Sequence, residues 1–134
     1  MREEHLHYSA AIIGAGPYGL AIAARLKAAK TDFVLLGRPM GFWRESVPCG
    51  TRLLSTPASC SLSDTEFDYR TYADRTGQAP ETLAGNDLVD YCLWFQRQAC
   101  GDSVKQEVVE LVSRNAANRF LAAFDEYRSL HRAA

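Results

Sequence analysis

The stretch "AIIGAGPYGLAIAARL", residues 11–26, places three glycines where a run of apolar residues gives way to an alanine-rich segment. Gly14, Gly16 and Gly19 have the GxGxxG spacing. Residues 8–13 form the short, nearly unbroken apolar run of a strand that is covered on both faces, as in a parallel sheet. The sequence therefore predicts a tight turn from a buried strand into a helix.

The segments after the glycines extend this turn into a larger unit. Residues 17–29 are apolar almost all round and begin with a proline at the favoured first helical position, so we expect a buried helix. Residues 32–36, "DFVLL", have the pattern of a second buried strand. A strand, helix and strand this close together form a right-handed parallel crossover. Residues 1–37 are therefore predicted to be one βαβ unit.

The spacing of the glycines has a chemical meaning in this setting. Gly14 permits the tight turn, Gly16 leaves the backbone bare, and Gly19 lets the helix lie close to the strand. The free N–H groups and the dipole of the helix N-terminus then attract an anion. We expect the pyrophosphate of a dinucleotide here, and the alternative is a purely structural glycine turn.

The end of the second strand lacks the acidic residue that usually binds the adenosine ribose, because Gly37 occupies that position. Arg38 follows it directly. Arg38 could pack on the adenine or bind a phosphate, including the 2′-phosphate of NADP, or it could be an ordinary surface arginine.

Residues 38–85 are rich in turn residues and read as a loop region that covers a ligand. A helix is predicted weakly over residues 68–76, closed by Gly77. A stronger one is predicted over residues 87–100, with Asn86 as its N-cap. Its core stripe comprises Leu88, Tyr91, Cys92, Phe95 and Ala99.

The end of the chain has the pattern of a β-hairpin. Residues 105–114 and 119–127 read as two antiparallel strands joined by the turn-prone "NAAN". We therefore expect residues 86–134 to form a helix followed by a hairpin, and the parallel sheet to contain only two strands of this chain. The predicted fold is α/β, with a Rossmann-like βαβ unit for dinucleotide binding.

"IIGAGPYGL" followed by "FVLLGRPMGFWRE" resembles the N-terminal flavin-binding segment of the flavoprotein monooxygenases, which include flavin-containing and N-hydroxylating enzymes. The resemblance extends less specifically to about residue 112, and it implies that residues 1–134 form a single, incomplete, Rossmann-like FAD/NAD(P)-binding domain. It implies that the glycine motif, with Pro17 and Tyr18, holds the FAD pyrophosphate. It also implies that Trp43 packs against the cofactor, and that the later helix and hairpin are an insertion in the flavin domain.

Two features depart from this family. The polar residue expected beside the flavin ring, often an asparagine, has only the hydroxyl candidates Ser55, Thr56 and Ser61. No glycine follows Gly101, so no second glycine-rich unit for NAD(P)H is present, and we expect a truncated or fragmentary oxidoreductase. The alternatives are a non-catalytic module that binds NADP or FAD and a non-functional fragment. Catalytic residues are not identified, and Met40 and Phe42 are expected to cover the adenine.

Composition limits the other classes of function. The 134 residues are 47% apolar and carry a net charge of -1, so neither nucleic acid nor a membrane is expected as a partner. The four cysteines lack metal-ligand spacing and read as free thiols of a cytoplasmic protein. His5 and His7 are not expected to bind a metal. An unfinished sheet edge is expected to allow self-association.

Overall fold

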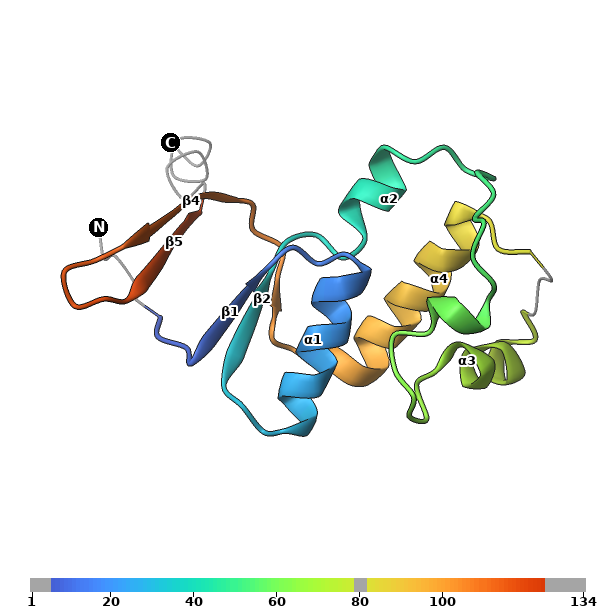
Figure 1. Cartoon of the computed structure of the whole chain (residues 1–134), viewed down its shortest axis with the longest axis horizontal. Coiled ribbons are helices and arrows are strands. Elements are labelled where there is room, and N and C mark those ends of the chain that lie inside the picture. The colour runs from blue at the N-terminus through green and yellow to red at the C-terminus, as the bar shows by residue number, and fades with distance from the viewer. Residues whose placement is uncertain (1–5, 79–81, 125–134) are drawn as a thin grey trace.

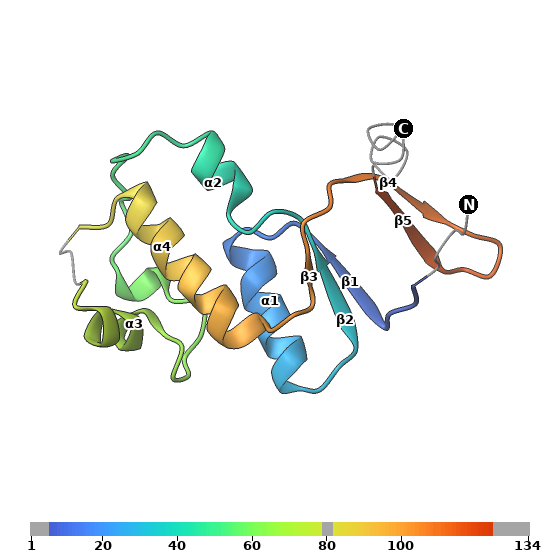
Figure 2. The same ribbon diagram turned by 180° about the vertical axis from the view of Figure 1, so that it is seen from behind.

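The structure is a computed structural model that describes residues 6–78 and 82–124 (Figure 1). Its main sheet is parallel, in the order β1-β2-β3, with β1 at Ala10–Ile13, β2 at Phe33–Leu36 and β3 at Val104–Lys105. A separate antiparallel hairpin joins β4 (Val109–Arg114) to β5 (Phe120–Phe124). In both views the sheet, α1, α4 and α3 follow one another across the molecule, and the hairpin lies on the far side of the sheet from the helices (Figures 1 and 2). The predicted α/β fold is confirmed.

The first βαβ unit is also confirmed, with α1 spanning Pro17–Ala28. β1 and β2 pair in register from Ala10 opposite Phe33 to Ile13 opposite Leu36. All four residues of β2 are buried, as expected. β1 is different, because every second residue is exposed and Ile13 keeps 52% of its surface accessible. Burial on both faces of β1 was therefore a wrong expectation: β1 is an edge strand among the residues described here.

The helix that was expected to be buried, α1, is only partly buried. Gly19, Leu20 and Ala23 are covered, whereas Ile22 is 50% exposed. Alanine-rich composition does not distinguish a helix covered all round from one covered on a single face. α1 packs with one face on the core and leaves the other open.

The sheet contains a third strand that the sequence did not reveal. β3 pairs in parallel with β2, Val104 opposite Leu35. The N–H of Leu35 donates to the Ser103 carbonyl at 2.8 Å, and the N–H of Gly37 donates to the Lys105 carbonyl at 3.0 Å. The expectations that Lys105 belongs to the hairpin and that the sheet has two strands are both wrong. A strand of two residues is too short to show a period.

Along the chain from β2 to β3, the described residues contain four further helical segments. They are α2 (Gly41–Glu45), the 3₁₀ turn η1 (Ala58–Cys60), α3 (Tyr69–Thr76) and α4 (Gly85–Phe95), and α4 continues into the π-helical turn η2 (Gln96–Cys100). α3 agrees with its prediction and ends at Gly77, which has φ +71°. α4 begins earlier than predicted, with Ala84 at the N-cap. Asn86 is not the cap, because its Oδ1 accepts a hydrogen bond from the Gly50 N–H at 3.1 Å.

The core lies between α1, α4 and the loop region. The predicted stripe on α4 and η2 is confirmed, since all five of its residues are buried: Leu88, Tyr91, Cys92, Phe95 and Ala99. The Tyr91 hydroxyl donates to the Phe67 carbonyl at 2.9 Å and accepts from the Leu62 N–H at 3.0 Å. Burial raises the pKa of Tyr91 to about 12, so the hydroxyl keeps its proton and can donate at neutral pH. These bonds tie the loop region to α4.

The N-cap of α3 gives a test of this local structure. Asp68 Oδ1 accepts a hydrogen bond from the Thr71 N–H at 2.8 Å, and bonds from the Thr71 backbone and hydroxyl lower the pKa of Asp68 from 3.8. We expect Asp68→Ala to reduce the free energy of unfolding by about 1 kcal/mol at neutral pH. Because the folded-state pKa is the lower one, this contribution is present above the unfolded pKa and is lost as pH falls through the folded value.

Urea denaturation of both proteins at pH 7 and at pH 2.5–4 measures the difference (~1 kcal/mol at pH 7). Asp68→Asn is the matched control, because asparagine caps equally well without a charge. An equal loss of stability for Ala and Asn would contradict the capping role.

Candidate nucleotide-binding site

Two glycines of the motif are required by the protein itself. Gly14 has φ +107°, which residues with a side chain rarely adopt, and its N–H donates to the Leu36 carbonyl at 2.8 Å. A Cβ on Gly19 would lie 1.8 Å from the Gly14 carbonyl oxygen. Gly14 and Gly19 therefore hold α1 against the end of β1.

Gly16 has no such internal reason to be glycine. It is the N-cap of α1, with φ −81°, and a Cβ there would have no heavy atom within 4 Å. All nine glycines lie among the described residues, and each of the others either has a positive φ or has an atom within 3.4 Å of its added Cβ. The space beside Gly16 opens outward at the start of a helix, where a ligand could approach the backbone.

The electrostatics of this helix end suit an anion. No side chain caps α1, and its first turn contains no acidic residue. The first N–H bonded within the helix is that of Leu20, which donates to the Gly16 carbonyl at 3.0 Å, so the N–H groups ahead of it point out of the helix end. Arg25 and Lys27 stand at the opposite, negative end. The arrangement can hold a phosphate group.

A second loop, after β2, lies directly against the first. The Met40 N–H donates to the Ala15 carbonyl at 2.8 Å, and a Cβ on Gly37 would lie 3.1 Å from the Ala15 nitrogen. Gly37 also has φ +134°. An acidic side chain at position 37 would therefore be strained and crowded, which explains its absence at the end of β2.

Of the other residues selected from the sequence, Pro17 and Tyr18 lie at the start of α1, whereas Trp43 and Phe42 lie on α2. Tyr18 is 88% exposed and Pro17 opens α1, so both lie at the helix end. Trp43 is half-buried and packs against the core beside Gly85, where its Cε3 atom would lie 3.9 Å from an added Cβ. Phe42 is 70% exposed.

Met40 does not lie where the sequence led us to expect it, and Arg38 has a partner that the sequence did not indicate. Met40 is fully buried and belongs to the core, so it does not cover the adenine. Arg38 forms an ion pair with Glu45, and about half of each side chain is exposed. Glu45 was not selected from the sequence, where the only signal was an acidic residue seven positions after Arg38.

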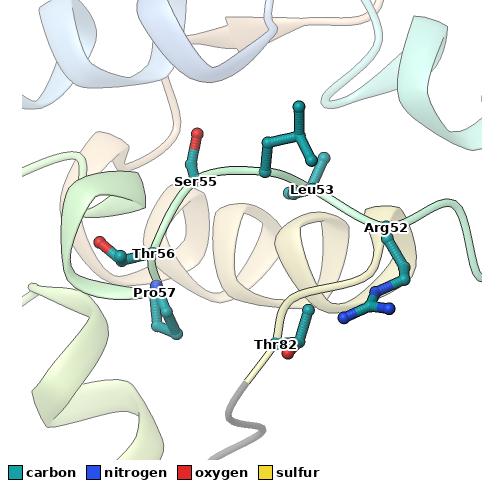
Figure 3. Close-up of a pocket in the computed structure, with 7 residues that line it drawn as sticks. Arg52, Leu53, Ser55, Thr56, Pro57 and Thr82 are labelled. Carbon is teal, nitrogen blue, oxygen red and sulfur yellow. The ribbon is translucent and has the colours of Figure 1, made fainter.

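Ser55, Thr56 and Ser61, the hydroxyl residues considered for the position beside a flavin ring, do not lie together. Ser55 and Thr56 line an open pocket of about 490 Å³ together with Arg52 and Thr82 (Figure 3). The Ser55 hydroxyl points to the opposite side of this segment from the Pro57 ring (Figure 3). Ser61 is separate, since its hydroxyl accepts a hydrogen bond from the Tyr69 N–H at 2.9 Å.

The remaining chemistry of the described residues is sparse. They contain no group of three or more metal-ligating side chains, and His5 lies outside them. All four thiols are free, and burial raises the pKa of Cys92 to about 12 and of Cys100 to about 11, which keeps both protonated. Over the same residues, every helix is too short or too polar to cross a bilayer.

Comparison with known proteins places this geometry in a structural class. No protein-family model matches the sequence, and no curated protein does. Among solved structures, L-lysine 6-monooxygenase from Pseudomonas syringae matches with a TM-score of 0.70 at 20% identity, over 90% of this chain and 34% of that one. Bacillithiol disulfide reductase from Staphylococcus aureus matches with a TM-score of 0.68 at 19% identity, over 87% and 33%.

A third match is the ornithine N-hydroxylase of Kutzneria sp. 744, in a structure with reduced FAD and NADP⁺, with a TM-score of 0.73 at 10% identity over 89% and 33%. At these low identities the TM-scores show a shared fold, which is the Rossmann-type α/β fold. These neighbours include monooxygenases, some of them solved with FAD bound, as the motif resemblance led us to expect, and also a disulfide reductase. This chain spans about a third of the length of these structures.

The glycines predict opposite outcomes for two substitutions. Gly16→Val should fold, because its Cβ meets no atom within 4 Å, yet lose at least tenfold in nucleotide affinity because the side chain fills the space beside the helix end. Gly19→Ala should fail to fold, because its Cβ would overlap the Gly14 carbonyl.

Circular dichroism with thermal unfolding tests folding, and calorimetric titration with FAD and NADP tests binding. Ser113→Val on exposed β4 introduces the same side chain away from the site and should change neither. Unaltered affinity in folded Gly16→Val would contradict the phosphate site.

Proposed function

We propose that this chain binds FAD and forms the N-terminal flavin-binding part of a flavin-dependent oxidoreductase of the monooxygenase type. The observation that carries the proposal is Gly16, whose bare backbone faces open space at the uncapped end of α1. The flavoprotein folds of the neighbours support the choice of FAD.

Each selected residue has a role in this proposal. Gly14, Gly16, Pro17 and Gly19 form the pyrophosphate turn, and Tyr18 borders it. Trp43 borders the cofactor from the core side, and Arg38 contacts the adenosine half of the cofactor. When bound, FAD supplies the redox chemistry, and the protein supplies binding and orientation. In this division, residues 1–37 bind, residues 38–85 cover the ligand, and residues 86–134 form the supporting insertion.

NADP is the second candidate ligand, in a module without catalysis. Arg38 favours it, because Arg38 directly follows Gly37 at the end of β2, where a dinucleotide's ribose would be bound, and a carboxylate at position 37 would be strained. In a full-length flavin enzyme NADPH would instead be a co-substrate. An oxidized steroid monooxygenase with a similar fold was solved with NADP bound, which supports NADP as a ligand.

The surroundings of the molecule are also part of the proposal. The free thiols fit a reducing compartment such as the cytoplasm. The open face of β1, with Ile13 exposed, fits association with a second copy of the chain. The net charge of -1 offers no attraction for nucleic acid.

Titration with the two nucleotides tests the proposed ligand. We expect the purified chain to carry yellow flavin or to bind added FAD, with an affinity at least tenfold greater than for NADP. Flavin absorbance and calorimetry measure this directly. Tighter binding of NADP than of FAD would favour the second candidate, and binding of neither would refute both.

Activity is expected to be absent even with FAD bound. No glycine follows Gly101, so these 134 residues contain no second glycine-rich unit to position a nicotinamide, and hydride transfer depends on that positioning. With FAD supplied, the chain should oxidise NADPH no faster than free flavin, followed by NADPH absorbance and oxygen consumption. A clear rate above that background, from a monomer, would show that a nicotinamide site exists elsewhere in the chain.

A further inference from the structure

The strand end that usually supplies a ribose-binding carboxylate cannot do so here. Gly37 lies against the phosphate turn. A Cβ added to Gly37 would lie 3.1 Å from the Ala15 nitrogen and 3.6 Å from the Gly14 Cα, and the φ of Gly37 is +134°. The ribose side of a bound dinucleotide would therefore meet the backbone of Gly37, and Arg38 is the next residue along the chain. Another residue must supply the acceptor if the ribose hydroxyls are to be bound.

The nearest carboxylate that the structure links to Arg38 comes from α2. Glu45, the last residue of α2, forms an ion pair with Arg38. α2 itself is fixed at its start, since the Gly41 N–H donates to the Arg38 carbonyl at 2.9 Å and the Arg44 N–H donates to the Met40 carbonyl at 2.9 Å. About half of each partner's side chain stays exposed, so the carboxylate is held but accessible.

We propose that Glu45, oriented by Arg38, accepts hydrogen bonds from the adenosine ribose and so selects dinucleotides that lack a 2′-phosphate. This inference rests on the proposed binding of a dinucleotide at α1. A carboxylate has about four acceptor positions, so the pair with Arg38 leaves some for ribose hydroxyls. A 2′-phosphate would instead meet the negative charge of Glu45, while the charge of Arg38 is already paired.

The ion pair between Arg38 and Glu45 is exposed, because about half of each side chain is accessible. An exposed ion pair contributes little to folding, so its removal should leave stability nearly unchanged. A purely structural role and a ligand-reading role therefore predict different results for the same substitution.

Two small probes separate the roles. ADP-ribose and 2′-phospho-ADP-ribose are titrated calorimetrically into the wild-type chain, Glu45→Gln, Arg38→Gln and the control Glu66→Gln, which changes an exposed acid in the loop before α3. We expect Glu45→Gln to lower the affinity for ADP-ribose by about tenfold and to weaken 2′-phospho-ADP-ribose less, or to strengthen it. Arg38→Gln should weaken ADP-ribose by a smaller factor, and Glu66→Gln should change nothing.

The outcomes that overturn the inference are distinct. If the wild type binds ADP-ribose and Glu45→Gln leaves the ratio of the two affinities unchanged, Glu45 does not read the ribose, although the proposed function stands. The inference also fails if Glu45→Gln weakens the 2′-phosphate probe more. If the wild type binds neither these probes nor FAD, the proposed function fails and the inference with it. Unfolding temperatures of all variants exclude loss of structure as the cause.

Discussion

The contact between Gly19 and the Gly14 carbonyl is the constraint on which the rest of this structure depends. Any side chain at position 19 would enter the space of that oxygen, so α1 can begin where it does only because residue 19 is glycine. The contact sets the angle between helix and strand. It thereby aims the positive end of α1 at the edge of the sheet where β1 and β2 both end.

A second loop completes this edge. Gly37 and Met40 bring the chain after β2 against Ala15, and the burial of Met40 anchors the start of α2. The core formed by α4 and the loop region then supports Trp43 from behind. The candidate site is thus made of backbone from two adjacent loops, and Arg38, which pairs with Glu45, belongs to the second of them.

The sequence predicted the parts of the fold that have strong local signals. The turn from strand to helix at the glycines, the helix that ends before Gly77, and the apolar stripe of α4 were predicted correctly, because each is fixed by residues within a few positions of one another. β3 was missed because its two residues pair with a strand about 70 positions earlier. The core position of Met40 and the pairing of Glu45 with Arg38 were not predicted for a similar reason, because only the folded chain shows which residues lie beside them.

The hairpin gives the molecule an uneven distribution of stability. None of residues 110–121 is buried, and apolar side chains such as Leu111 and Phe120 stay largely exposed. A two-stranded ribbon without a buried face has little free energy opposing its opening. Local unfolding of β4 and β5 should thus occur far more often than unfolding of the chain as a whole, so their amide hydrogens exchange with solvent well before those of β2.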